Sequence, residues 1–308
     1  MYQERKPSRS EFVPVRHLNY HVRLWGEPMA GQAPLVLLHG WMDVAASWQF
    51  VVDALPQDRL VIAPDWRGYG LTGAGSAGKS GYRPAVDSYW FPDYLADLDF
   101  LLDHYSPAAP VDLAGHSMGG NVAMLYAGVR PGRIRRLVNL EGFGMPATQP
   151  AQAPGRYARW IDELKAFHRD ERALRPYGSV QGVAQRLMKT NPRLPADKAA
   201  WLAGHWARQE ADGLWRILGD PAHKVTNAQL YRVDEVLEIH RAISAPTLCV
   251  EADDSQLETW WQGKYTLAEY RERVRAVPDA RHALVKGAGH MLHHDQPEVV
   301  AELIAAFL

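Results

Sequence analysis

The feature that most limits the fold of this chain is a series of short, continuously apolar runs that recur along most of its length. Helical patterns, such as residues 93–105 and 297–308, separate several of them. A short run without polar alternation suits a strand that is buried on both faces, as in a parallel sheet. Strands that alternate with helices predict an α/β fold. The apolar runs, each closed by turn residues, are 34–40, 59–65, 110–117, 134–142, 246–254 and 282–290.

Two regions depart from this alternation. Residues 12–25 alternate loosely between apolar and polar side chains and predict a β-hairpin. Residues 143–243 are rich in Trp, Arg and helix-forming residues and contain no convincing strand. A chain of this length can hold one large domain with an insertion. We therefore expect an α/β core formed by residues 1–142 and 244–308, with a helical cap at 143–243.

The overall composition argues against several kinds of partner. Hydrophobic residues make up 47% of the 308 residues, and the formal net charge is −1. This near balance gives no electrostatic reason to expect nucleic acid or an anionic membrane. The one cysteine, Cys249, cannot form an internal disulfide or a cysteine-built metal site. The sequence MYQERKPSRS lacks the apolar core of a signal peptide, and no apolar run approaches membrane-spanning length, so we expect a cytoplasmic protein.

Two glycine-rich patterns resemble nucleotide-binding motifs. Residues 73–80 match G-x-x-x-x-G-K-[ST], and residues 68–73 match G-x-G-x-x-G. Both motifs bind phosphate only when a strand runs into the glycines and a helix begins after them. The apolar run at 59–65 ends before Gly68, and the sequence GYRP at 81–84 cannot begin a good helix. We therefore expect a surface loop here and no bound nucleotide.

The strongest chemical signal is the sequence GHSMG at 115–119, which matches G-x-S-x-G with an apolar run before it and a helical pattern after it. The two glycines allow the sharp strand-to-helix turn that exposes a nucleophile, here Ser117. A serine hydroxyl needs a base, and His290, on a loop after the last apolar run, is the candidate. The backbone amides of Met118 and Trp41 would form the oxyanion hole.

Other histidines near these motifs need a separate interpretation. His290, His293 and His294 form the pattern H-x-x-H-H, which is typical of some metal sites. No acidic or cysteine residue stands at ligand spacing beside them, so we expect loop or helix-start histidines and no bound metal. His39, in the loop after the run 34–40, is expected to hydrogen-bond to the backbone rather than to take part in catalysis.

The motifs LLHGW, PDWRGYG, GHSMGG and GAGHMLHHDQPE, in this order, resemble those of the α/β-hydrolase superfamily. The HGW-x-D opening and the stretch QRLMKTNPRLP are similar to its serine hydrolase-like branch. The resemblance implies an eight-stranded, mostly parallel sheet with a helical cap after the sixth strand. It also implies a structural role for Asp65, Arg67 and Gly68. The family members that use an aspartate nucleophile, epoxide hydrolases and haloalkane dehalogenases, are poor models for a chain with Ser117.

The sequence departs from the family pattern at the acid that should accompany the histidine. In the family this acid usually follows the seventh strand, three residues past a glycine, but here Ala252 and Ser255 occupy these two positions. Asp254 stands one position before Ser255, and Asp253 stands two positions before it. Some members carry the acid just after the sixth strand, where this chain has Glu141. Both Glu141 and Asp254 are candidates to orient the imidazole and stabilise its cation, with Glu141 favoured by its longer reach.

These residues predict a serine hydrolase that cleaves a small-molecule carboxylic ester through an acyl-enzyme intermediate, without a cofactor. The same residues could cleave an amide, a lactone or a carbon–carbon bond, and a non-catalytic binding protein could use the same scaffold. The oligomeric state stays open. Candidates to line an apolar substrate pocket are Phe143, Met145 and Trp160, with the further tryptophans Trp201, Trp206, Trp215, Trp260 and Trp261.

Overall fold

The computed structural model describes residues 1–56, 58–72 and 86–308, and its centre is an eight-stranded sheet with the order β1-β2-β4-β3-β5-β6-β9-β10. The pairs β1–β2 and β2–β4 are antiparallel, and the other neighbouring pairs are parallel. The predicted hairpin and the predicted mostly parallel sheet are therefore confirmed. The strands are β1 (Arg9–Val15), β2 (Leu18–Trp25), β3 (Leu35–Leu38), β4 (Val61–Pro64), β5 (Val111–His116), β6 (Ile134–Leu140), β9 (Thr247–Ala252) and β10 (Ala280–Val285).

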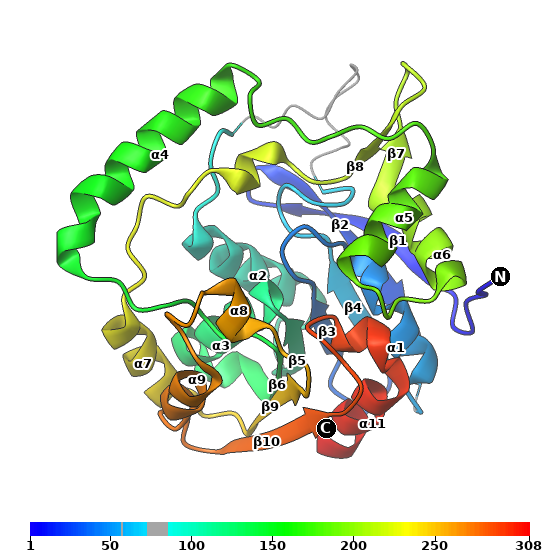
Figure 1. Cartoon of the computed structure of the whole chain (residues 1–308). Helices are drawn as coiled ribbons and strands as arrows, with labels where there is room; N and C mark the ends of the chain where they lie inside the picture. Colours follow the sequence, from blue (N-terminus) through cyan, green and yellow to red (C-terminus); the bar gives the residue numbers. More distant parts are fainter. Residues whose placement is uncertain (57, 73–85) are drawn as a thin grey trace.

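The central strands β3, β4 and β5 are buried on both faces because helices cover both. In β3, Val36 and Leu38 belong to one buried cluster, and Leu35 and Leu37 belong to another. Successive side chains of a strand point to opposite faces, so a strand covered on both sides shows no polar alternation. Helices α2 (Phe91–Tyr105) and α3 (Met118–Val129) pack in the first cluster, and α1 (Gln49–Ala54), α10 (Leu292–Asp295) and α11 (Pro297–Phe307) pack in the second (Figure 1).

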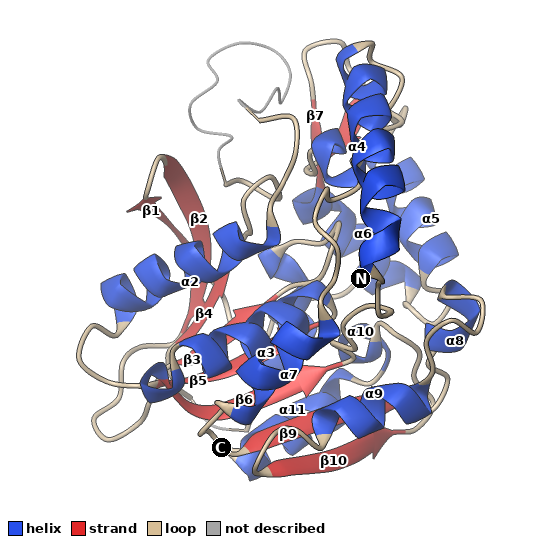
Figure 2. Ribbon diagram, turned by 90° about the vertical axis from the view of Figure 1, so that its left-hand side faces the viewer, coloured by secondary structure: helices blue, strands red, loops and turns tan. Residues whose placement is uncertain are grey.

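The segment between β6 and β9, called the insertion below, contains helices and a small hairpin. Figure 2 shows α4, α5, α6 and β7 gathered at one end of the molecule, away from α11 and β10. The elements of the insertion are α4 (Ala153–His168), α5 (Val180–Thr190), α6 (Ala196–Trp206), β7 (Ala207–Gln209), β8 (Trp215–Ile217) and α7 (Val233–Arg241). In the described part of the chain, no helix has both the length and the apolar character to cross a membrane.

The expectation that the insertion has no strand is wrong. Residues 207–209 pair antiparallel with residues 215–217. The connecting turn is closed by hydrogen bonds from the Gly213 amide to the Glu210 carbonyl and from the Glu210 amide to the Leu214 carbonyl, each 2.9 Å long. Strands of three residues are too short to show a period of two in the sequence.

Apolar packing joins the insertion to the sheet core. Helices α5 and α6 share a buried cluster with Val44, Ala46 and Phe50 of the core. Helix α7 lies against α3, where a side chain at Gly128 would collide with the carbonyl oxygen of Ile239. The range 143–243, predicted as the cap, therefore includes α7, a helix that packs directly on the core helix α3.

The loop after β4 is held by buried polar contacts. The Arg67 guanidinium donates to both carboxylate oxygens of Asp97 on α2, at 2.6 and 2.7 Å, and both side chains are buried. The Asp65 carboxylate accepts hydrogen bonds from the amides of Ala45 and Leu71, at 2.7 and 2.9 Å. These contacts agree with the structural role implied for this loop.

The glycine-rich patterns fall partly in this loop. Strand β4 ends at Pro64, and Gly68 and Gly70 lie in turns, so no strand runs directly into them. The segment 73–80, which matches the other nucleotide-binding pattern, lies outside the described residues.

Candidate active site

Ser117 stands at the sharp turn between β5 and α3, with φ of 52° and ψ of −116°. Positive φ is uncommon for a residue other than glycine and persists only where the surroundings impose it. Here the Ser117 amide donates to the Leu140 carbonyl at 2.9 Å. The flanking glycines are needed for close packing, because a side chain at Gly115 would collide with the Gly119 carbonyl, and one at Gly119 with the Leu38 carbonyl.

Three residues that are far apart in the sequence meet at this turn. The His290 imidazole places Nε2 at 2.9 Å from Ser117 Oγ and Nδ1 at 3.2 Å from Glu141 Oε2. Ser117 follows β5, Glu141 follows β6 and His290 follows β10. The carboxyl ends of parallel strands lie at one edge of a sheet, which is where ligands of open α/β sheets bind. The three side chains are therefore linked in the order expected of a nucleophile, a base and an acid, with the imidazole in the middle.

The Glu141 carboxylate is fixed by contacts other than the one with His290. Its Oε1 accepts a hydrogen bond from the Ala252 amide at 2.7 Å, and its Oε2 accepts one from the Ser255 hydroxyl at 3.2 Å. Ser255 occupies the position where the family usually carries its acid. Burial raises the pKa of Glu141 to about 8, against the lowering effect of these hydrogen bonds. Burial also lowers the pKa of His290 to about 4, so the imidazole is neutral at pH 7.

The other acid candidate does not reach the imidazole. The half-exposed Asp254 carboxylate lies 2.5 Å from Nη2 of Arg193, which follows α5 in the insertion. Asp253 accepts hydrogen bonds from the amides of Gly287 and Ala288, at 2.9 and 3.1 Å. The structure therefore brings Glu141 to His290 and uses Asp254 to connect the insertion with the core.

The loop after β3 passes beside the serine. A Cβ atom added to Gly40 would lie 3.2 Å from Ser117 Cβ, and Trp41 follows directly. Within the described residues, no acceptor is found for the backbone amides of Trp41 and Met118. His39 accepts a hydrogen bond from the Trp66 amide at Nε2, at 2.9 Å, and its Nδ1 donates to the Gly40 carbonyl at 2.8 Å. The expectation that His39 bonds to the backbone is confirmed.

The predicted pocket residues lie in different surroundings. Phe143 is buried and packs edge-on against Tyr270, with ring centroids 4.8 Å apart. Met145 is exposed, and Trp160 is half-buried on α4. Trp260, one of several tryptophans that the sequence offered without distinction, lies edge-on to the His290 ring with centroids 4.5 Å apart. Only the fold shows that this tryptophan is the one beside the imidazole.

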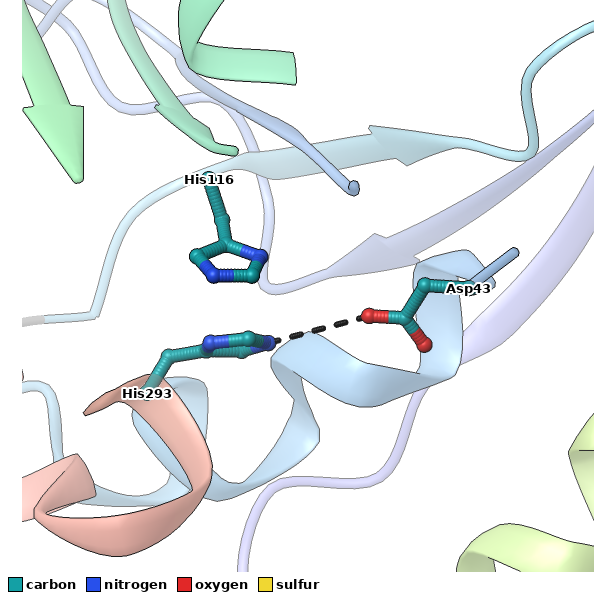
Figure 3. Close-up of side chains that lie close together, drawn as sticks. All are labelled: Asp43, His116 and His293. Atoms are coloured by element: carbon teal, nitrogen blue, oxygen red, sulfur yellow. Dashed lines mark ion pairs between the residues drawn. The ribbon is translucent and has the colours of Figure 1, made fainter. Parts of the chain in front are cut away.

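A group of side chains that could hold a metal ion lies next to these residues. It consists of Asp43, His116 and His293 (Figure 3). The sequence around His293 offers no acidic residue at ligand spacing, but the fold supplies Asp43 from the loop after β3. No local signal could have joined them, because the three residues lie on segments that are distant in the chain.

The fold and this site define a hydrolase of the α/β-hydrolase class. Residues 33–297 match the family described as alpha/beta hydrolase fold, and the chain belongs to it. Among solved structures, a thioesterase domain from the curacin biosynthetic pathway is similar with a TM-score of 0.79 and 24% identity. That similarity covers 97% of this chain and 99% of the thioesterase chain, and it shows the shared fold.

Similar sequences place the chain more closely within the family. It is 28% identical to a serine hydrolase-like protein of Danio rerio over 305 residues, which cover 97% of this chain and 88% of the relative. It is 23% identical to serine hydrolase-like protein 2 of Homo sapiens over 309 residues, which cover 96% and 92% of the two chains. These similarities support the serine hydrolase-like branch that the sequence motifs predicted.

Proposed function

We propose that this hydrolase uses Ser117 to cleave a carboxylic ester through an acyl-enzyme intermediate. The observation that supports the proposal best is the imidazole of His290, which lies between Ser117 Oγ at 2.9 Å and Glu141 Oε2 at 3.2 Å. A hydroxyl in this position can lose its proton to the imidazole as it attacks.

The reaction would proceed in two halves. Ser117 Oγ attacks the acyl carbon while its proton moves to His290 Nε2. The tetrahedral intermediate then expels the alcohol, which takes that proton, and the acyl group stays on Ser117. Water attacks the acyl-enzyme, again with its proton going to His290, and the collapse of the second intermediate releases the acid and restores the serine. The amides of Met118 and Trp41 would stabilise the oxyanion in both halves.

The electrostatics of the buried pair support these roles. His290 is neutral at pH 7, because burial lowers its pKa to about 4, and it can therefore accept the serine proton. The ionised Glu141 would accept the Nδ1 proton, which leaves Nε2 free to act as the base. Since burial raises the pKa of Glu141 to about 8, the ionised form dominates only in mildly alkaline solution.

The surroundings of the site favour an apolar substrate. Trp41 and Trp260 are 52% and 47% exposed, and Met145 is also exposed. Trp260 contacts the His290 ring, and Trp41 follows the loop that passes beside Ser117. Exposed large apolar side chains beside a reactive group are typical of a binding surface. We therefore propose a small-molecule ester with an apolar acyl or alcohol part, with Met145 and Trp260 in contact with it.

A thioester is the second candidate substrate, because the structurally similar curacin-pathway protein is a thioesterase domain. The same serine, histidine and acid would act on either bond, since only the leaving group differs. Neither nucleic acid nor a membrane is part of the proposal. Cys249 is free and buried, so no disulfide ties the fold to an oxidising compartment, and the cytoplasm remains the proposed location.

Hydrolysis of p-nitrophenyl esters of increasing acyl length tests the proposal. We expect measurable turnover that increases from acetate to longer chains and that falls by about 10⁶-fold, or to background, in Ser117→Ala. A fluorophosphonate probe should label the wild-type chain stoichiometrically and leave Ser117→Ala unlabelled. A folded wild-type protein that reacts with neither reagent would favour a binding protein on a hydrolase scaffold and would contradict the proposal.

A further inference from the structure

Asp43, His116 and His293 form a cluster that the proposed reaction does not use. They come from the loop after β3, the end of β5 and helix α10, and their exposed fractions are 5%, 2% and 0%. Each offers one ligand atom, and these atoms all lie within 4.8 Å of one another. Figure 3 shows the two imidazole rings facing each other with the carboxylate beside them.

The cluster contains polar atoms that lack partners. Asp43 Oδ1 accepts hydrogen bonds from the Val44 amide at 2.9 Å and from the Ser47 hydroxyl, but Oδ2 has no hydrogen-bond partner within the described residues. It lies 3.8 Å from His293 Nε2. His116 Nδ1 and both ring nitrogens of His293 also have no hydrogen-bond partner among the residues that the structure describes. A buried polar atom left unpaired destabilises the fold, so such a group needs a ligand or ordered water.

The hydrogen bond of His116 fixes the position of its ring proton. Its Nε2 lies 2.7 Å from the backbone carbonyl oxygen of His290, and a carbonyl oxygen can only accept. Nε2 therefore carries the proton, and Nδ1 presents a lone pair to the cluster. Metal-binding histidines commonly donate their other ring N–H to a carbonyl or carboxylate in this way.

We propose that Asp43, His116 and His293 bind a divalent transition-metal ion of the Zn²⁺ type. Two imidazole nitrogens and one carboxylate oxygen suit Zn²⁺, Co²⁺ or Ni²⁺, whereas Ca²⁺ and Mg²⁺ prefer sites built from oxygen alone. Metal ligation uses the unprotonated form of each imidazole and the anionic form of the carboxylate. Three protein ligands leave a coordination position for water.

Metal uptake by matched variants tests this site. The untagged chain is stripped with EDTA, desalted, incubated with excess ZnCl₂, desalted again and analysed by inductively coupled plasma mass spectrometry. We expect about one zinc per wild-type chain, since the site offers one set of three ligands. Asp43→Asn should retain only a small fraction of it. The asparagine oxygen can still accept from Val44 and Ser47, so this variant keeps the local structure while its NH₂ group cannot bind metal.

A control and a second readout separate a specific site from surface binding. His294 is the buried neighbour of His293 but lies outside the three ligands, and His294→Gln should take up zinc like the wild type. Zinc at about 100 times its dissociation constant should raise the wild-type Tm by roughly 5 °C, and it should not raise that of Asp43→Asn. If circular dichroism shows that Asp43→Asn is unfolded, His293→Gln takes its place.

Two results would overturn the proposal. The first is a folded wild-type chain that takes up no zinc and shows no change in Tm, which would mean that the cluster holds only ordered water. The second is equal zinc uptake by the wild type and the ligand variant, which would place the ion elsewhere.

Discussion

The substitution Glu141→Gln tests most directly how the imidazole is oriented. In the structure, Glu141 Oε1 accepts a hydrogen bond from the Ala252 amide at 2.7 Å. A glutamine must keep its carbonyl oxygen at that position, because an NH₂ group cannot accept from an N–H donor. The NH₂ group then takes the place of Oε2, which lies 3.2 Å from His290 Nδ1. The new side chain has nearly the same shape, so the fold should be unchanged.

The expected loss follows from the tautomer that this amide imposes. An NH₂ donor at His290 Nδ1 requires a lone pair there, so the ring proton moves to Nε2. Nε2 then points an N–H at Ser117 Oγ, 2.9 Å away, and cannot accept its proton. Losing the correct tautomer in a serine triad costs about 10⁴ in turnover, or about 5.4 kcal/mol in the activation free energy. We expect a loss of this order in kcat, with little change in KM.

The assay is steady-state hydrolysis of the best p-nitrophenyl ester, with Ser117→Ala as the background. Asp254→Asn is the matched control, because Asp254 pairs with Arg193 and does not reach the imidazole. It should retain activity within about 2-fold, as expected for an exposed ion pair. The reasoning is refuted if Glu141→Gln loses less than about 10-fold while its circular dichroism spectrum matches the wild type.

Three further predictions concern pH and stability. The value of kcat/KM should rise with pH with a midpoint near 8, because the reaction requires the ionised Glu141, whose pKa burial raises to about 8. A midpoint at or below 6.5, the ordinary pKa of histidine, would contradict this. In urea, Asp97→Asn should lower the free energy of unfolding by about 3–5 kcal/mol, because the buried Arg67 guanidinium loses its fully buried partner and keeps, among the described residues, only the partly exposed Asp93, 3.1 Å away. Asp93→Asn leaves the Arg67–Asp97 pair in place and should cost less than about 1 kcal/mol. Gly128→Ala should lower the stability measured by thermal unfolding by about 1–3 kcal/mol, since the new methyl group collides with α7. Gly132→Ala places its methyl group where no atom lies within 4 Å, and it should change stability by less than about 0.5 kcal/mol. Equal effects of the two substitutions would contradict the close packing of α3 on α7.

The sequence by itself determined the parts of this protein that depend on local chemistry. The buried strands appear as continuous apolar runs, because a strand covered on both faces has no polar side to alternate with. The turn at Ser117 appears as glycines at fixed spacing, because the backbone of α3 packs too closely for side chains there. The same reading missed the hairpin at 207–217, whose strands are too short to carry a period. It also could not choose between Glu141 and Asp254.

The tertiary structure made that choice through the pairing of β6 with β9. Leu140 pairs with Val250, so Glu141, the residue after β6, lies beside the end of β9 and receives the Ala252 amide. Asp254, two residues past the end of β9, turns instead toward Arg193 of the insertion. The cluster of Asp43, His116 and His293 also forms only when distant segments of the chain pack together. Strand register and the packing of distant segments decide such contacts, and no local pattern in a chain encodes them.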